Sequence, residues 1–302
     1  RYLSIEIINF MKVHLATFYS FDLKRSAVRF KSQAEEMGVY DHIHLFNPND
    51  LNDDFKKYVL SLIKKGKKRG YGHWVWQTYI HQVILSKMKE GDIYHWCDVG
   101  CHFNKNGTLR LREYLEIVSK DKNGCLFFSY KKPNFGNQYD NYYFEPNLES
   151  QYTKSDLFEY FNLGYEDKII NTPQVWGGSF FIRKCLISEK LLKDHFEITR
   201  NRYDLIDDDE SKFIKKSFPG FIAHRHSQSV LSILAKKINC DFISAYESEW
   251  ALDENKNRTY KHLHNFPIIA RRDKKKNVFL RFFDRQKKTY ARLKKKNCFI
   301  EI

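Results

Sequence analysis

The sequence lacks any apolar run that approaches the roughly 18 residues needed for a membrane-spanning helix. Its first 20 residues hold neither a long apolar run nor a small-residue cleavage site, so they do not have the layout of a signal peptide. We therefore expect neither a membrane span nor a secretory leader. Met11 resembles a natural start, so residues 1–10 are expected to be an upstream or added segment.

The sequence also lacks a disulfide framework. Its six cysteines show no regular spacing, and a chain of 302 residues does not need disulfides to stabilise its core. We therefore expect free thiols in a reducing cytoplasm. No internal repeat and no clean linker interrupts the chain, which favours one domain over residues 11–265, followed by an extension over residues 266–302.

Positive charge is abundant: the formal net charge is +15. Much of the excess lies in "KKGKKRGYG" at 64–72 and in the tail at 271–298. Such an excess suits nucleic acid, anionic lipid or a phosphorylated ligand, or only a solvated surface. No nucleic-acid motif is present, so no nucleic-acid partner is expected. The tail interleaves apolar and basic residues, which predicts a basic amphipathic helix lying on an anionic membrane or packed on the domain.

Strand-like and helix-like patterns alternate along the chain, which predicts an α/β fold with a mostly parallel sheet. "KVHLATFYS" and "DHIHLFNP" alternate like strands, whereas "RSAVRFKSQAEEMGV" places apolar residues on one helical face before Gly38. Further helices are predicted near residues 50–66, 73–92, 107–122, 153–163, 188–201 and 226–238, and further strands near 93–100, 124–130, 175–184 and 240–245.

The stretch "IYHWCDVGCHF" at 93–103 is rich in cysteine and histidine. A zinc site or a redox thiol pair is disfavoured, because no second cluster with suitable spacing exists and the cysteines are spaced C-x-x-x-C. A strand would alternate its side chains and deliver Asp98 at its carboxyl end, where ligands bind in open α/β sheets. Gly100 would then let the backbone approach a ligand. A turn-capping aspartate is the alternative.

Several segments together resemble a known family. "GYGHWVWQTYI" and "EGDIYHWCDVGCHFN" resemble the pattern G-Y-W-x-W-K-P-Y…G-D-x-x-x-Y-x-D-x-G of bacterial capsule and lipopolysaccharide glycosyltransferases of the GT-A type. "TKSDLFEYF", "NTPQVWGGSFFIRK" and "HRHSQSVLSILAKK" follow in the same order as in that family. The resemblance covers residues 11 to about 265 and implies a GT-A-like, Rossmann-like domain.

The resemblance implies roles for individual residues. Asp98 and Gly100 stand at the D-x-D motif that binds Mn²⁺ or Mg²⁺ and the sugar nucleotide, with Gly100 replacing the second acid. His264, or alternatively His262, would complete the metal site. Gln228 stands where retaining relatives place a glutamine beside the anomeric carbon, so Gln228 and Asp98 are the expected catalytic residues.

The remaining expected contacts divide between the two ends of the donor. The nucleotide-sugar contacts are Ala16, Thr17, Phe18, Arg25, Lys68, Arg69, Gln77, Asp98 and Gly100, with Arg29 an alternative to Arg25. Gln77 replaces the lysine of the family pattern. The sugar and acceptor pocket would contain Gln174, Trp176, Gly177, Gly178, His224 and His226. The two glycines could equally form a β-bulge.

The expected activity is transfer of a sugar from a nucleotide-diphosphate sugar, with UDP favoured, to a saccharide or lipid-linked saccharide of a surface glycan. Retention of configuration is favoured, although an inverting enzyme could take a base from Asp207 to Glu210. The expected location is the cytoplasm, with peripheral contact at the inner membrane. The alternatives are a nucleic-acid-binding protein, or an inactive relative, since Gly100, Ser227 and Gln77 depart from the family pattern.

Overall fold

The computed structural model describes residues 11–134, 136, 139–164 and 166–271. Up to Arg271 the chain forms one compact unit. Residues 1–10, and residues 272–302 of the expected amphipathic extension, lie outside the described residues. No helix in the described residues is long and apolar enough to cross a membrane.

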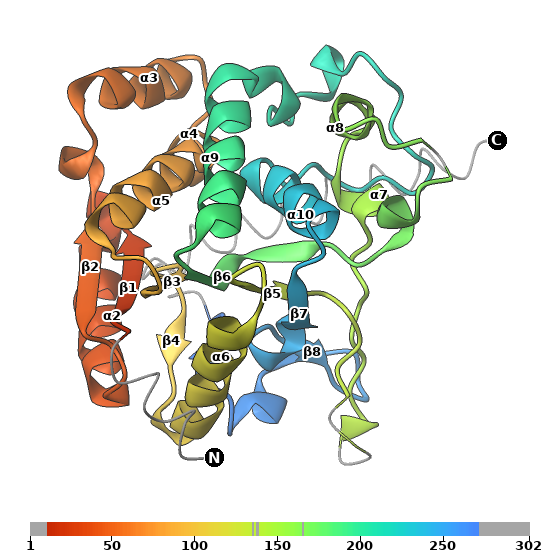
Figure 1. Ribbon diagram of the computed structural model, residues 1–302. Coiled ribbons are helices and arrows are strands. Elements are labelled where there is room, and N and C mark those ends of the chain that lie inside the picture. The colour runs from red at the N-terminus through yellow and green to blue at the C-terminus, as the bar shows by residue number, and fades with distance from the viewer. Residues whose placement is uncertain (1–10, 135, 137–138, 165, 272–302) are drawn as a thin grey trace. The chain divides into compact units, whose positions relative to one another are not determined.

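A six-stranded sheet forms the centre of the unit (Figure 1). Its strands are β1 (Val13–Phe18), β2 (His42–Phe46), β3 (Ile93–Cys97), β5 (Cys125–Ser129), β6 (Val175–Arg183) and β7 (Asp241–Ser244), in the order β2-β1-β3-β6-β5-β7. Strand β6 is antiparallel to both of its neighbours, and the other pairings are parallel. The predicted α/β class with a mostly parallel sheet is confirmed.

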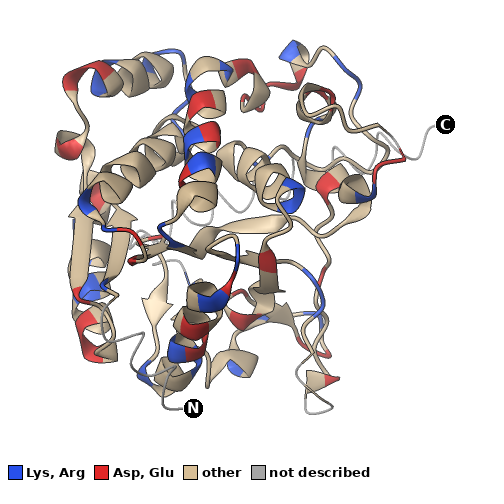
Figure 2. Ribbon diagram, viewed as in Figure 1, with Lys and Arg blue, Asp and Glu red and all other residues tan. Residues whose placement is uncertain are grey.

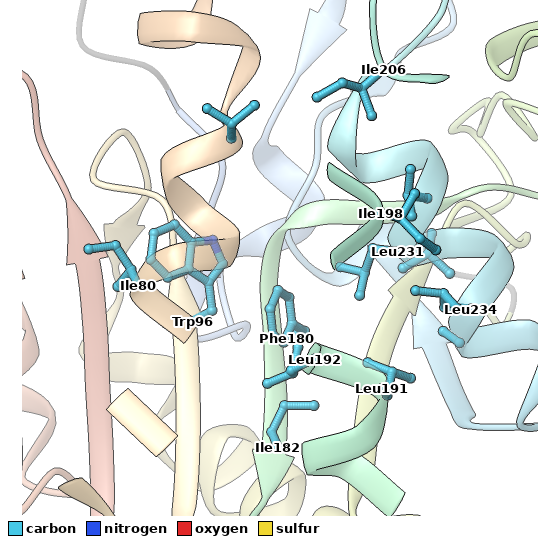
Figure 3. Close-up of a cluster of buried hydrophobic side chains, with 14 of the residues drawn as sticks. Ile80, Trp96, Phe180, Ile182, Leu191, Leu192, Ile198, Ile206, Leu231 and Leu234 are labelled. Atoms are coloured by element: carbon cyan, nitrogen blue, oxygen red, sulfur yellow. The ribbon is translucent and has the colours of Figure 1, made fainter. Parts of the chain in front are cut away.

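Helices cover both faces of this sheet (Figure 1). One face packs against α3 (Asp53–Lys64), α5 (Val75–Lys87), α9 (Leu186–Asn201) and α10 (Ser227–Lys237). The other face packs against α2 (Lys24–Met37) and α6 (Thr108–Lys120). Strand β3 shows how the alternation works: Tyr94 and Trp96 enter the first core, whereas Ile93 and Cys97 enter the second. Figure 3 shows part of the first core, where Trp96 and Phe180 meet side chains of α5, α9 and α10.

The helix ends follow local rules. Helix α2 ends at Gly38, whose left-handed φ of 62° is accessible to glycine without steric cost. Helix α3 begins after Asn52, whose side chain accepts a hydrogen bond from the backbone N–H of Phe55.

Charged residues concentrate on the helices and loops, while the central strands carry few (Figure 2). This pattern buries the sheet between two apolar layers.

Strand β6 is antiparallel to its neighbours because the chain enters β6 at the same edge of the sheet where it leaves β5. The backbone N–H of Tyr130, one residue past β5, donates to the carbonyl of Gln174, one residue before β6. The chain therefore re-enters the sheet at the edge where the parallel strands end. The first residues of β6 consequently lie beside the carboxyl ends of those strands.

Short elements complete the unit. They are α4 (Gly70–His73), α7 (Glu149–Tyr152), α8 (Ser155–Tyr160), β4 (His102–Phe103), β8 (Ala251–Leu252), β9 (Arg258–Thr259) and β10 (Ile268–Ile269). Strand β10 pairs with β4, and β8 pairs with β9. Because β10 is part of the compact unit, this unit extends beyond the expected boundary at residue 265.

Candidate functional site

Asp98 lies immediately after β3, at the carboxyl edge of the sheet. Its backbone N–H donates to the carbonyl of Gly178 at 2.8 Å, and its own carbonyl accepts from the N–H of Cys101 at 2.8 Å. Asp98 and Gly100 therefore belong to a tight turn that is attached to the start of β6. This placement agrees with the sequence prediction of a carboxylate at the end of a strand.

The side chain of Arg29 in α2 forms hydrogen bonds with the backbone of this turn. Its guanidinium donates to the carbonyls of Val99 and Cys101, each at 2.8 Å. The sequence predicted that Arg29, as an alternative to Arg25, contacts the diphosphate. In the structure its guanidinium is hydrogen-bonded to the backbone of the turn. Arg25, the preferred candidate, lies exposed near the start of the same helix.

The start of β6 contains an irregularity at its two glycines. The register with β5 shifts here, because Phe127 pairs with Phe180 while Phe128 pairs with Trp176. Gly177 and Gly178 thus lie in a bulge, which was one reading of the sequence. A Cβ on Gly178 would lie 2.3 Å from the Trp176 ring, so the ring folds against a position that only glycine can fill.

Three glutamine side chains gather around Gly177. Gln77 of α5 donates to the Gly177 carbonyl at 3.2 Å. Gln228 of α10 packs on the Cα of Gly177, so that a Cβ there would lie 3.3 Å from the Gln228 side chain. The amide nitrogen of Gln228 donates to Gln174 at 2.9 Å. The structure therefore brings together residues from three separated motifs at the same bulge.

Gln174 anchors this amide group. It is fully buried, and its amide nitrogen lies within hydrogen-bonding distance of Thr153 and Ser229. Its amide oxygen accepts from Gln228 and from Arg225. Because a buried amide with several partners is fixed in one orientation, Gln174 positions Gln228 rather than presenting its own amide to a ligand.

A second polar group lies near the start of the same two helices. His73 Nε2 lies 3.6 Å from one carboxylate oxygen of Asp208, and His226 Nε2 lies 3.5 Å from the other. The two imidazole rings are 4.1 Å apart between centroids. His73 and His226 are buried, whereas the Asp208 side chain is 33% exposed. In the described residues, this is the only group of three close side chains of the metal-ligating types.

Burial keeps these histidines neutral. Desolvation, with a contribution from neighbouring His73, lowers the pKa of His226 to about 4. Desolvation also lowers the pKa of His73, although Asp208 opposes the shift. His224, the other histidine of the predicted pocket, is buried with Nε2 at 2.9 Å from the Leu205 carbonyl. It is a structural residue in this environment.

The predicted metal-completing histidines lie in a different environment. Nε2 of His262 is buried 3.1 Å from the carbonyls of Tyr246 and Glu249. His264 is exposed, and its carbonyl accepts from Asn104. No group of three metal-ligating side chains within the described part of the chain contains Asp98. A Mn²⁺ or Mg²⁺ ion at Asp98 would therefore need substrate phosphates and water to complete its ligands, and the partnership of Asp98 with His264 or His262 stays a prediction.

The predicted nucleotide contacts are divided between the core and the surface. Ala16, Thr17 and Phe18 lie in β1 with buried side chains, and Phe18 stacks on Trp76 at 3.9 Å. Lys68 and Arg69 are exposed. Arg69 lies 5.6 Å from the centre of the Trp74 ring, and 3.7 Å from Asp208. Contact of any of these residues with a nucleotide stays a prediction.

Cys97, Cys101 and His95 of this stretch are buried in the core, whereas His102 is half-buried and lines a hollow at the surface. Cys97 and Cys101 are buried free thiols in the layer of α2 and α6. His95 lies between Tyr40 and Ser179, at 2.8 and 2.9 Å, and stacks on Phe181. Every cysteine in the described residues is free, in agreement with the sequence, while Cys298 lies outside them.

A hollow of about 550 Å³ lies beside β4 and β10. Its lining includes Lys105, Lys261 and Arg271, which give it a basic character. None of the predicted site residues lines it. The hollow is therefore separate from the glutamine group, although its lining includes His102 of the stretch at 93–103 and Arg271, the first residue of the basic tail.

No protein-family model matches the chain, and no curated protein sequence matches it significantly. Among solved structures, the chain is similar to a glycosyltransferase involved in the glycosylation of the major capsid of PBCV-1. The TM-score is 0.44 at 12% identity, over 85% of this chain and 91% of that one. It is also similar to mouse xyloside xylosyltransferase 1 in its apo form, with TM-score 0.40 and 8% identity, over 79% and 87% of the two chains. Neither likeness identifies the activity of this chain.

Sequence reasoning did not find two features of this region. Arg29 was considered only as a ligand for phosphate, and Asp208 only as one of four acids that could supply a base. His73 was not singled out at all. The signals existed, in the histidine beside Trp74 and in the run of acids at 207–210, but nothing in the sequence pairs segments so far apart.

Proposed function

We propose that this protein is a glycosyltransferase that uses a nucleotide-diphosphate sugar. The observation that carries the proposal is the meeting of Asp98, the Gly177–Gly178 bulge, Gln77 and Gln228 at the carboxyl edge of the sheet. These residues come from the segments whose order resembles capsule and lipopolysaccharide glycosyltransferases. The carboxyl edge is where ligands bind in open α/β sheets.

The reaction breaks the bond between the anomeric carbon and the phosphate oxygen, and the nucleoside diphosphate leaves with the electron pair. An acceptor hydroxyl forms the new bond and passes its proton to the departing diphosphate oxygen. In this proposal Gln228, held by Gln174, contacts the sugar beside the anomeric carbon. Asp98 contacts the nucleotide sugar, and Lys68 and Arg69 neutralise the diphosphate. A Mn²⁺ or Mg²⁺ ion at Asp98 would be held by this carboxylate together with the substrate phosphates and would help to neutralise the leaving diphosphate.

Retention of configuration remains favoured over inversion. An inverting enzyme needs a base that can take the acceptor proton. Burial opposes ionisation of Asp207, but hydrogen bonds from Lys67 and Lys212 prevail and lower its pKa to about 2. A carboxylate with so low a pKa is a weak base. Asp207 is therefore a poor base, and the inverting alternative is left to Asp208, Asp209 and Glu210 of the same acidic run.

The acceptor is proposed to be a saccharide or lipid-linked saccharide of a surface glycan, with UDP-sugars as the favoured donors. A cytoplasmic protein in peripheral contact with the membrane would suit such an acceptor. The basis for these details is the family resemblance together with the basic tail at 271–298.

A thermal-shift screen of nucleotide sugars, with and without Mn²⁺, tests the proposal. A ligand at 100 times its Kd stabilises the folded state by about 2.7 kcal/mol, which corresponds to roughly 2–4 °C for each kcal/mol. We expect one class of nucleotide sugar to raise the melting temperature of the wild type. Asp98→Asn should lose this shift while keeping the unliganded melting temperature. No shift with any nucleotide sugar would refute the proposal.

Donor hydrolysis separates an active enzyme from an inactive relative. Wild-type protein should release nucleoside diphosphate slowly from its donor, and Asp98→Ala should abolish this release. Binding without any hydrolysis or transfer would instead identify a protein that binds nucleotide sugars but has lost its chemistry. Tight, salt-dependent binding of oligonucleotides together with indifference to nucleotide sugars would favour a nucleic-acid-binding protein.

A further inference from the structure

The group of His73, Asp208 and His226 is assembled from three separate segments. His73 ends α4, Asp208 lies between two short helical turns in the loop after α9, and His226 immediately precedes α10. One ligand atom from each residue lies within 4.8 Å of the other two. The three side chains therefore converge on a common point.

Hydrogen bonds on the far side of each ring orient the two histidines. Nδ1 of His226 lies 2.9 Å from the Ile206 carbonyl, which can only accept, so this nitrogen carries the proton. The lone pair of His226 is consequently on Nε2, which faces Asp208. Nδ1 of His73 lies 2.8 Å from the Tyr203 hydroxyl. Metal-binding histidines typically have such a second partner on the outer nitrogen.

Nε2 of His226 is a buried atom without a hydrogen-bond partner. The whole residue is 2% exposed, so bulk solvent does not reach this atom. An unpaired buried polar atom is costly, and each such case calls for an explanation such as an ion. The nearest charged group is Asp208, at 3.5 Å, which is beyond a good hydrogen bond but suitable for two ligands of one ion.

The spacing is close to that of a tetrahedral metal site. With bonds of about 2.0–2.1 Å, neighbouring ligand atoms around zinc lie roughly 3.3 Å apart. The two imidazole nitrogens lie 3.6 and 3.5 Å from different oxygens of the Asp208 carboxylate, and one ligand atom from each of the three residues lies within 4.8 Å of the other two, so the side chains would draw together around an ion. We propose that His73, Asp208 and His226 bind a divalent transition-metal ion such as Zn²⁺, for which two histidines and one carboxylate are a known set of ligands. Three protein ligands leave a fourth position for water or another ligand.

Arg69 is the competing partner of Asp208. Its guanidinium lies 3.7 Å from the carboxylate, and its side chain is 63% exposed. An ion pair with an exposed arginine at that distance contributes little free energy. Binding of a cation to Asp208 can therefore displace the Arg69 side chain into solvent. The half-exposed Asp208 leaves the site open to solvent on that side.

Metal at this position would fix the starts of two helices. His73 precedes Gln77 by about one helical turn, and His226 precedes Gln228 by two residues. These two glutamines flank Gly177. The ion would thereby connect the loop at 64–74, the loop at 203–210 and the start of α10. The inference does not depend on the transferase proposal, because metal binding requires no donor sugar.

Cobalt substitution tests the site directly. Full-length protein is stripped with a chelator and titrated with Co²⁺, followed by visible absorption and by competition with Zn²⁺. We expect one equivalent of Co²⁺ to produce the intense bands of a tetrahedral site, and Zn²⁺ to abolish them. Asp208→Asn should weaken binding by roughly 100-fold or more, because it removes the only anionic ligand.

Matched variants assign the result to these residues. Asp209→Asn alters the neighbouring exposed acid, and Asp98→Asn alters the predicted D-x-D position; both should retain the cobalt spectrum. His226→Gln should lose it, with circular dichroism confirming the fold, and Asp208→Asn serves if His226→Gln does not fold. The proposal is overturned if wild-type protein binds no stoichiometric Co²⁺, or if Asp208→Asn binds as tightly as wild type.

Discussion

Gly178 occupies a position with no room for a side chain. A Cβ would lie 2.3 Å from the buried ring of Trp176, which must then move within a packed core. Gly178→Ala is expected to lower the free energy of unfolding by about 1–3 kcal/mol, measured by urea denaturation. Gly164→Ala is the control, because nothing lies within 4 Å of its Cβ position. Equal stability of the two variants would contradict the steric argument.

The ion pairs of Asp207 make the free energy of unfolding depend on pH in the acid range. Its side chain is 5% exposed, and despite the opposing effect of burial its ion pairs with Lys67 and Lys212 lower its pKa to about 2. Since the folded pKa lies below the unfolded one, the stabilisation is complete above the unfolded pKa and disappears as the pH falls towards 2. Asp207→Asn should cost about 2 kcal/mol at pH 7.

Urea denaturation of wild type and Asp207→Asn from pH 7 down to pH 2 measures this coupling. The difference in unfolding free energy between the two proteins should narrow as the pH falls below about 4, because the wild-type carboxylate then becomes protonated. A difference that stays constant down to pH 2 would show that the ion pairs of Asp207 do not stabilise the fold.

At the scale of elements, α2 controls the turn that carries Asp98. The guanidinium of Arg29 binds the carbonyls of Val99 and Cys101. Arg29→Met keeps the aliphatic stem and removes both charged hydrogen bonds. We expect hydrogen exchange of a peptide covering residues 98–103 to accelerate by at least about tenfold, because even one such bond contributes about 1.5–3 kcal/mol.

Arg25→Met is the matched control for this experiment, since Arg25 lies exposed on the same helix. Its exchange over residues 98–103 should equal that of wild type. If Arg29→Met also exchanges like wild type, then α2 does not position the turn. The proposed contact of Asp98 with the nucleotide sugar would then have to be explained without a fixed backbone.

The start of α5 shows where local patterns fail. The sequence predicts a helix from residue 73, yet α5 begins at Val75. His73 and Trp74 have left-handed φ angles of 59° and 61°, which cost energy in residues other than glycine. His226, before α10, has a φ of 54°. Both histidines of the proposed metal site thus have strained backbones, and such strain requires support from tertiary contacts.

At the scale of the whole molecule, the charge is unevenly distributed. Residues 272–302 contain twelve Lys and Arg against three Asp and Glu, so they supply most of the net charge of +15. Replacing Lys294, Lys295 and Lys296 by Gln in the full chain should weaken binding to vesicles containing phosphatidylserine. At about 1 kcal/mol for each lysine, the expected loss is roughly 100-fold at low salt.

A co-sedimentation assay measures this binding, and high salt should remove the difference between variants. Replacing Lys57, Lys64 and Lys65, which lie at exposed positions on or beside α3, provides a control with the same change in charge. If the control weakens binding equally, attraction to the vesicle depends on total charge. A specific role of the tail at the membrane would then be rejected.

The sequence by itself determined the succession of helices and strands, the α/β class and the position of Asp98 at a strand end. These features follow from local periodicity and from capping residues, which act over a few neighbours. The burial of Cys97 and His95 on one side of β3 follows from the same alternation, once the strand is recognised.

Only the tertiary structure decided the direction of β6, the convergence of Gln77 and Gln228 on Gly177, and the grouping of His73 with Asp208 and His226. Each of these depends on contacts between segments that are distant in the chain. Periodicity carries no information about which distant segments meet, because that choice is made by packing of the whole core. The sequence already placed Gly177 in a predicted pocket, but only the packing of α5 and α10 brings Gln77 and Gln228 to it.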